Sequence, residues 1–270
     1  MNHASNRTKQ AETLGISRSN LYYKSRQDPK DQRLKIMIEE ALRKHPAYGH
    51  KRMAIHLSAN KKRVLRVMQK YDIKPYRRRG KKWLSKGTRA IEYPNLILNM
   101  VPLYPNHIWA SDFTYLWFDG AWIYLATIID VYTRKIVGMA LSRSHDRWLV
   151  SSAMLDALGH YRRPDIAHSD HGSEYCSRDY QKIMADTGIM PSMASKGCPW
   201  ENGYQESFYS QFKIELGDPS RFSSLGELTA MIYSQIYYYN NSRIHTALNM
   251  APVAFARQYD LLLESREKVS

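Results

Sequence analysis

Two β-forming runs joined by a tight-turn dipeptide constrain the fold of this chain more than any other feature. Residues 108–118 read IWASDFTYLWF, residues 122–130 read WIYLATIID, and Asp119-Gly120 between them is typical of a type I′ hairpin. The elements expected after this hairpin are a strand at 135–141, a helix at 146–161, a short strand ending at Asp170, a helix near 178–187, a strand at 189–194, and helices beginning at Glu201 and Leu225. The order βββαβαβα predicts one mixed sheet flanked by helices.

Upstream of the hairpin, the spacing of apolar residues predicts three helices, at 32–44, 51–57 and 60–71, with Asn60 as an N-cap. On the last helix, Val64, Leu65 and Met68 form the expected buried stripe. Its other sides carry cations that we take as candidate DNA contacts: Lys61, Lys62, Arg63 and Arg66. The periodicity alone fits a recognition helix and a solvated basic face equally well.

A basic stretch without apolar period follows and favours the nucleic-acid interpretation. Between Tyr76 and Trp83 it carries the candidate DNA contacts Arg77, Arg78, Arg79, Lys81 and Lys82. Residues 1–100 hold 25 basic and 7 acidic side chains, a net charge of +18, against 15 and 18 in residues 101–270. Because a basic block binds polyanions through counterion release, nucleic acid is the expected partner.

Several protein classes are excluded or disfavoured by the same sequence. No run approaches the ~20 apolar residues of a membrane span, so a cytoplasmic, nucleoid-associated protein without a membrane partner is expected. Cys176 and Cys198 form no CxxC pair, which disfavours a zinc site and a disulfide framework.

Three carboxylates are the candidate catalytic residues. Asp112 interrupts an otherwise apolar strand, where an unpaired carboxylate is costly. Asp170 stands at the carboxyl end of a short strand, where α/β folds place ligands. Glu206 lies on the predicted helix about 180° from the aromatic stripe Tyr204, Phe208 and Phe212, and it shares its side with Asn202, Tyr209 and Lys213.

These residues stand in motifs that resemble the DDE transposase and retroviral integrase superfamily, most closely the second-frame (OrfB) transposases of IS3-type insertion sequences. The matching segments are 109–115 (WASDFTY), 168–175 (HSDHGSEY), 195–197 (SKG), 201–208 (ENGYQESF) and 240–245 (NNSRIH). Asp170 and Glu206 enclose 35 residues, and Lys213 follows Glu206 by seven. The one departure noted is Glu201, where the family usually has Asp.

The resemblance implies a ribonuclease-H-like catalytic core, a mixed five-stranded sheet flanked by helices. It also implies that Asp112, Asp170 and Glu206 bind two Mg²⁺ or Mn²⁺ ions, and that Lys196, Asn202 and Lys213 contact DNA near the cut end or support the site. The implied partners are double-stranded DNA, both element terminal inverted repeats and target. A homo-oligomer on DNA and an upstream-frame protein or fusion are also implied.

The expected organisation has five parts: a partial helix-turn-helix-like segment (1–30), a helical DNA-binding region (31–73), a basic linker (74–100), the catalytic core (101–218) and a C-terminal helical extension (219–270). The expected function is DNA strand cleavage at element ends followed by strand transfer. Two alternatives stay open: a metal-dependent nuclease of the same fold, and a DNA-binding protein with an inactive remnant site.

Overall fold

The hairpin predicted from the sequence forms the middle of a five-stranded sheet. In a computed structural model, which describes residues 11–13, 15, 17, 27–76, 93–195 and 198–267, strands β1 (Ile108–Phe118) and β2 (Ala121–Asp130) pair antiparallel in unbroken register from Trp109 opposite Asp130 to Phe118 opposite Ala121. Asp119 and Gly120 both have positive φ, 46° and 72°, as a type I′ turn requires.

The remaining strands complete the order β3-β2-β1-β4-β5. Strand β3 (Ile136–Ser142) is antiparallel to β2, whereas β4 (Ile166–Ser169) and β5 (Met190–Met193) run parallel to β1. Strand β4 pairs only with residues 108–110 of β1, so the following part of β1 has no strand beside it on that edge. A free strand edge therefore begins just before Asp112.

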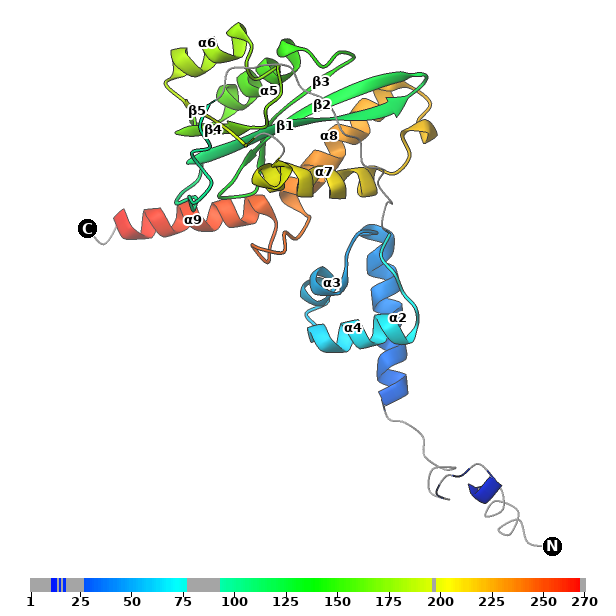
Figure 1. Ribbon diagram of the computed structural model, residues 1–270. Helices are drawn as coiled ribbons and strands as arrows, with labels where there is room; N and C mark the ends of the chain where they lie inside the picture. Colours follow the sequence, from blue (N-terminus) through cyan, green and yellow to red (C-terminus); the bar gives the residue numbers. More distant parts are fainter. Residues whose placement is uncertain are drawn as a thin grey trace, which may run out of the picture.

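Helices cover both faces of this sheet (Figure 1). On one face, α5 (Arg147–His160) and α6 (Arg178–Thr187) bury a core that includes Trp109, Ile128 and Met154. On the other face, α7 (Gly203–Leu216) and α8 (Leu225–Asn241) bury Leu125, Phe208 and Ile232. The shorter elements here are the 3₁₀ helices η2 (Pro199–Asn202) and η3 (Pro219–Arg221), and α9 (Pro252–Glu267) follows α8. The mixed five-stranded sheet with helices on both faces confirms the predicted fold class.

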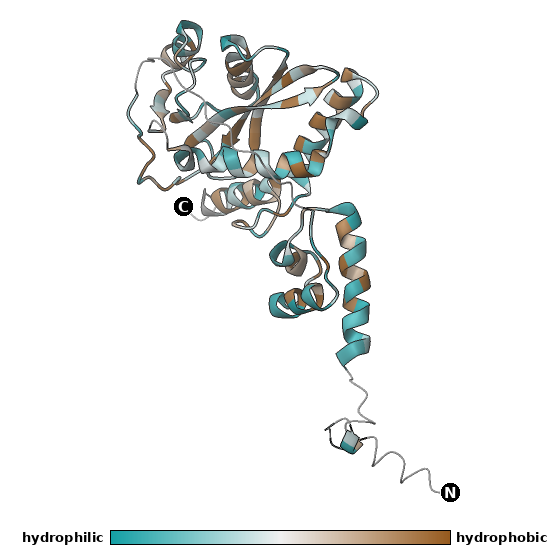
Figure 2. Cartoon of the chain, turned by 45° about the vertical axis from the view of Figure 1, so that its right-hand side comes forward, coloured by the Kyte–Doolittle hydropathy of each residue, from teal (hydrophilic) through white to brown (hydrophobic). Residues whose placement is uncertain are grey.

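A separate helical unit precedes the sheet. It consists of α2 (Gln27–Lys44), α3 (His50–His56) and α4 (Lys61–Lys70), which share a core built around Ile38, Met53 and Val64. Apolar residues interrupt an otherwise hydrophilic α2 in Figure 2. The Asn60 side chain caps α4 as predicted, accepting from the Lys62 and Arg63 backbone N–H groups.

The buried stripe of α4 differs from the prediction at one position. Val64, Val67 and Met68 are buried, whereas Leu65 is 37% exposed. Leu65 follows Val64 by 100° around the helix and so turns away from α2 and α3.

None of the described helices is both long and apolar enough to cross a lipid bilayer.

The helical unit contacts the end of α8. The Tyr48 hydroxyl accepts a 3.0 Å hydrogen bond from the Ile244 backbone N–H, and the Ile244 side chain packs against the core of the helical unit. The His45 Nδ1 atom lies 2.5 Å from the Tyr238 hydroxyl oxygen. These contacts join segments nearly 200 residues apart in the sequence.

Candidate active site

Asp112 and Asp170 come together where β4 stops beside β1. Asp112 is the second residue of β1 beyond its pairing with β4, and Asp170 directly follows Ser169, the last residue of β4. Because the two strands run parallel, both carboxylates emerge at the same edge of the sheet. The topology thus brings together two residues that lie 58 positions apart.

The proximity of the two carboxyl groups affects their ionisation. Burial raises the pKa of the Asp112 carboxyl well above its usual range, and the negative charge of Asp170 raises it further. The Phe113 backbone N–H, which donates a 2.8 Å hydrogen bond to Asp112, and the Lys213 ammonium both oppose this shift in pKa. Burial also raises the pKa of Asp170, opposed by a 3.0 Å hydrogen bond from the Gly172 N–H.

Glu206 is exposed on α7. Its negative charge also raises the pKa of Asp112, but by less than burial and the charge of Asp170 do. Across the described residues, no three acidic, histidine or cysteine side chains surround one point closely enough to hold a metal ion. The structure therefore places the three carboxylates in one neighbourhood but does not gather them into a closed ligand set.

Helix α7 is fixed to β1 by three side chains. Three consecutive carbonyl oxygens of β1 accept hydrogen bonds: Ala110 from the Gln205 amide at 2.6 Å, Ser111 from the Asn202 amide at 3.1 Å, and Asp112 from the Tyr209 hydroxyl at 2.7 Å. Gln205 and Tyr209 also contact Thr127 of β2. Sequence reasoning missed the role of Gln205, because a glutamine next to a catalytic motif carries no sign of being fully buried.

Asn202 was expected to contact DNA or to support the site, and the structure favours support. Its side chain is 5% exposed and is held against the Ser111 carbonyl, so it does not offer itself to a DNA backbone. Lys213 remains beside Asp112, with its Nζ atom 4.9 Å from the centre of the Tyr115 ring. Lys196 lies outside the described residues.

The residues around Asp170 position the loop that follows β4. His168 is fully buried, its Nδ1 atom lies 2.9 Å from the Ser192 hydroxyl, and burial lowers its pKa to about 4. The Glu174 carboxylate contacts His145 Nδ1 at 3.1 Å. Asp130, at the end of β2, stabilises the turn that follows, since it accepts hydrogen bonds from Tyr132 and Thr133.

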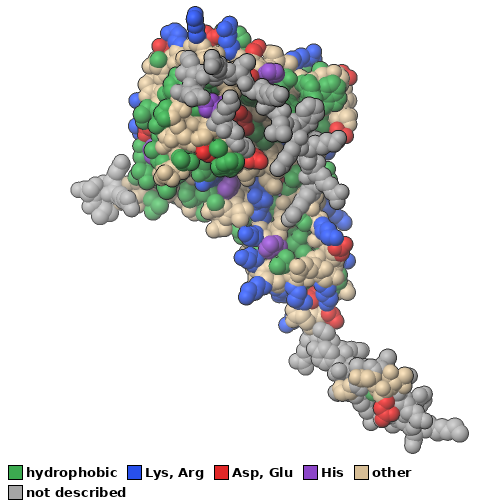
Figure 3. Space-filling model, viewed as in Figure 1, with side chains coloured by type: hydrophobic (Ala, Val, Ile, Leu, Met, Phe, Trp, Pro, Cys, Tyr) green, Lys and Arg blue, Asp and Glu red, His purple; other side chains and the backbone are tan. Residues whose placement is uncertain are grey.

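The predicted DNA contacts of the helical unit divide into two groups. Lys61, Lys62 and Arg63 are exposed, and Lys and Arg side chains gather on this unit in Figure 3. Arg66 instead forms a two-pronged ion pair with Asp31 of α2 at 2.7 and 2.6 Å, and Asp31 is 0% exposed. The Arg66 guanidinium therefore joins two helices, while its side chain keeps 46% exposure, and its contact with DNA stays a prediction. Arg77, Arg78, Arg79, Lys81 and Lys82 lie outside the described residues.

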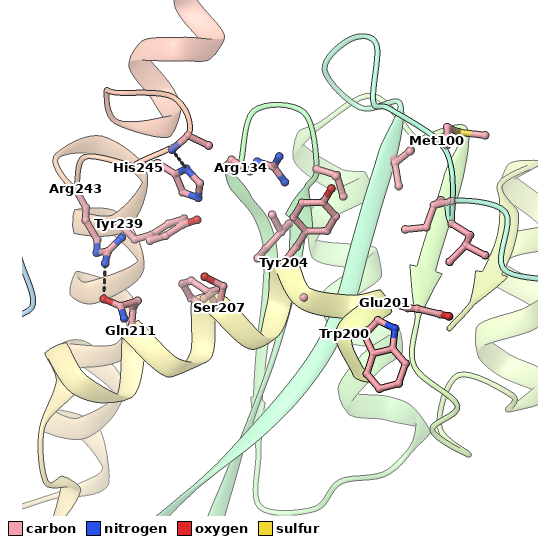
Figure 4. A pocket seen from close by; sticks show the side chains of 18 of the residues that line it. Met100, Arg134, Trp200, Glu201, Tyr204, Ser207, Gln211, Tyr239, Arg243 and His245 are labelled. Atoms are coloured by element: carbon pink, nitrogen blue, oxygen red, sulfur yellow. Dashed lines mark hydrogen bonds between the residues drawn. The ribbon is translucent and has the colours of Figure 1, made fainter. Parts of the chain in front are cut away.

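A cavity lies away from the carboxylates. It measures about 550 Å³ and is lined by the side of α7 that carries Tyr204, Ser207 and Gln211 (Figure 4). Glu206 does not line it and projects about 100–160° around the helix from these three residues. Asp112 and Asp170 do not line this cavity and lie instead at the sheet edge where β4 ends.

Comparisons with known proteins show similarity to integrase core domains and to proteins of insertion elements. Two family models described as an integrase core domain match residues 102–199 and 187–252. The Shigella sonnei "Insertion element IS600 uncharacterized 31 kDa protein" is 32% identical over 265 residues, covering 92% of this chain and 97% of that protein. The transposase for insertion sequence element IS904 of Lactococcus lactis is 35% identical over 206 residues, covering 72% and 78%.

Two further matches are shorter or more distant. Transposase InsF for insertion sequence IS3A of Escherichia coli is 37% identical over 145 residues, covering 53% of this chain and 50% of that protein. Among solved structures, a chain of the simian T-cell lymphotropic virus intasome in complex with PP2A regulatory subunit B56 gamma has a TM-score of 0.50 at 16% identity, covering 82% of this chain and 74% of that one. At that identity the likeness concerns the fold alone.

Proposed function

The chain belongs to the DDE transposases of IS3-type insertion sequences, and from this premise we propose that it cuts DNA at the ends of its element and joins the freed 3′-OH to another phosphodiester. The observation that carries the proposal is the edge of the sheet where Asp112 and Asp170 meet, with Glu206 and Lys213 close by. Water is the first nucleophile, and no covalent protein–DNA intermediate is required.

The donor chemistry at this edge suits divalent cations. The ligands offered are carboxylate oxygens, which Mg²⁺ and Mn²⁺ prefer. A cation would stabilise the ionised form of Asp112, whose pKa is raised by burial and, secondly, by the charge of Asp170. We assign Asp112 to two ions, Asp170 to one and Glu206 to the other. When bound, two such ions activate the attacking oxygen and stabilise the leaving oxygen of an in-line displacement.

The chain's own residues then orient the DNA and hold the carboxylates. Gln205, Asn202 and Tyr209 fix α7 against β1, so that Glu206 keeps its place relative to Asp112. Lys213, on the same side of α7 as Glu206, neutralises a phosphate near the cut end. We propose Lys196 as a further phosphate contact.

The helical unit and the linker supply most of the DNA affinity in this proposal. Lys61, Lys62 and Arg63 are exposed on α4, and the cations of residues 77–82 extend the basic surface along the chain. The proposed ligands are the terminal inverted repeats and the target DNA, bound by a homo-oligomer, with an upstream-frame protein or fusion as a further partner.

Cleavage and joining of a labelled element-end substrate in Mg²⁺ test the proposal. Asp112→Asn, Asp170→Asn and Glu206→Gln should each abolish both products and leave DNA binding largely intact. Asp186→Asn is the matched control, because Asp186 is exposed on α6 and its ion pair, with Lys182, lies at the surface. Near-wild-type joining by any triad variant contradicts that residue's assignment, and cleavage without joining by the wild type would favour a nuclease.

A further inference from the structure

The 550 Å³ cavity gathers three arginines from three separate parts of the chain, two of which, Arg134 and Arg243, are labelled in Figure 4. Arg52 comes from α3 of the helical unit, Arg134 from the turn between β2 and β3, and Arg243 from the segment after α8. All three guanidinium groups act on one imidazole, since their charges add to burial in lowering the pKa of His245 to about 4. The arginines therefore share one electrostatic environment.

The carboxylates at this cavity are fewer than the arginines, and they already have partners. Glu215 pairs with Arg243 at 2.7 Å, in a contact where both side chains are nearly inaccessible. Glu201 accepts hydrogen bonds from the Ser195 backbone and the Asn95 amide. Arg52 and Arg134 have no carboxylate partner within ion-pair distance among the described residues.

Both of these arginines also keep donors without acceptors. The Arg134 guanidinium stacks on the Tyr204 ring, with its Cζ atom 4.3 Å from the ring centre. The ring covers the flat face of the guanidinium but accepts no hydrogen bond from the N–H groups at its edge. Its Nε and Nη1 atoms are buried without a hydrogen-bond partner among the described residues, and so is Nε of Arg52. Buried donors of this kind are costly unless a ligand or water satisfies them. Only a hydrogen-bond acceptor can satisfy these nitrogen donors, and the positive charge of the arginines favours an anionic acceptor.

The lining suits a nucleotide more than a bare ion. Tyr204 and Trp200 offer aromatic faces of the kind that stack on bases and sugars, and Trp200 is 69% exposed. The volume lies in the range of small-molecule sites. Glu206 does not line the cavity, so the ligand would be a different part of the DNA from the phosphodiester that is cut.

We propose that this cavity binds a phosphate group of the DNA backbone, with Arg52 and Arg134 as its donors. The inference rests on the proposed function, because that function supplies DNA as the ligand. Since Arg52 belongs to the helical unit and Arg134 to the sheet, a phosphate held by both would couple DNA binding to the placement of the helical unit beside the catalytic core.

The test compares Arg52→Gln and Arg134→Gln with the wild type in the full chain. For duplex DNA, log K falls as log salt rises, and each variant should make this dependence shallower by about 0.9, which corresponds to the loss of one phosphate contact. Over a fourfold range of salt, this difference amounts to about a threefold change in affinity. Arg147→Gln is the control, because Arg147 lies on the far face of the sheet and pairs with Asp179. Arg134→Lys keeps the charge and should retain most of the slope.

A second measurement separates the anion site from the DNA assignment. Inorganic phosphate, exchanged for chloride at constant ionic strength, should raise the thermal midpoint of the wild type saturably and that of the two Gln variants less. No saturable response in the wild type would overturn the anion site. A saturable response with unchanged DNA slopes would overturn the DNA assignment. Failure of the proposed function would appear separately, as absent Mg²⁺-dependent cleavage by a wild type that still binds DNA.

Discussion

The Tyr209 hydroxyl donates a 2.7 Å hydrogen bond to the backbone carbonyl of Asp112, and so joins the helix of the third proposed metal ligand to the strand of the first. Glu206 precedes Tyr209 by three residues, less than one helical turn. The separation between the Asp112 and Glu206 carboxylates is thus set by contacts that do not involve either carboxylate.

Replacing Tyr209 with Phe should slow catalysis more than it weakens folding. We expect a loss of about 1 kcal/mol in the free energy of unfolding, because the Tyr209 hydroxyl loses its hydrogen bonds with the Asp112 carbonyl and the Thr127 hydroxyl, while Thr127 keeps Gln205 as an acceptor. The rate of single-turnover cleavage should fall roughly tenfold, the equivalent of about 1.4 kcal/mol, with DNA affinity unchanged. Tyr233→Phe, at an exposed position of α8, serves as the control. An unchanged cleavage rate would show that the Tyr209 hydroxyl has no positioning role.

Arg66 and Lys62 should separate folding from DNA binding within one helix. Arg66→Ala removes the closest partner of buried Asp31 and leaves it only the longer contact with Lys70 as an ion pair among the described residues, so it should lower the stability of the helical unit. Lys62→Ala removes an exposed cation and should leave stability unchanged while weakening DNA binding. Chemical denaturation and a DNA titration of both variants check this. Equal stability of the two variants would contradict the structural role of Arg66.

The strands and helices could be predicted from the sequence because their patterns are local. The β1 strand was predicted to the residue, since its aromatic and β-branched run ends at Asp119-Gly120. The ion pair between Arg66 and Asp31 was not predicted, because the two residues lie 35 positions apart and helical spacing reports only neighbours on the same helix. The burial of Asn202 and the cavity between α3, α7 and the β2–β3 turn likewise depend on tertiary contacts.

Gly138 is a place where the sheet and α5 leave no room for a side chain. A Cβ atom there would lie 2.4 Å from the Ala153 carbonyl oxygen and 2.7 Å from the Ala157 Cβ. Gly138→Ala should therefore destabilise the core by about 1–3 kcal/mol. Gly159→Ala is the matched comparison, because it lies in α5 with nothing near its Cβ, and it should stabilise by up to about 1 kcal/mol. Thermal melting of both variants gives the answer, and a neutral Gly138→Ala would refute the close packing.

His245 predicts a dependence of stability on pH. Burial and the charges of Arg134, Arg243 and Arg52 lower its pKa from 6.5 to about 4, so the unfolded chain binds a proton that the folded chain does not. Stability should fall as pH decreases from 6.5 to about 4, by up to about 1.4 kcal/mol per pH unit from this residue. His245→Gln should reduce that slope, whereas His160→Gln, at an exposed position, should not. Identical slopes in urea titrations of all three proteins would contradict the assignment.

The ionised Asp112 carboxylate should lower the thermal stability of the protein when metal is removed. Its raised pKa means that the folded state disfavours the ionised carboxyl, so wild-type stability falls as pH rises from near 3.8 through the higher folded pKa. In EDTA near neutral pH, Asp112→Asn should match or exceed the wild type in thermal midpoint. Millimolar Mn²⁺ should raise the wild-type midpoint more than that of the variant, since a ligand that binds only the folded state stabilises it. A variant less stable in EDTA, with an equal response to Mn²⁺, would make Asp112 a structural carboxylate held by the Phe113 N–H rather than a metal ligand.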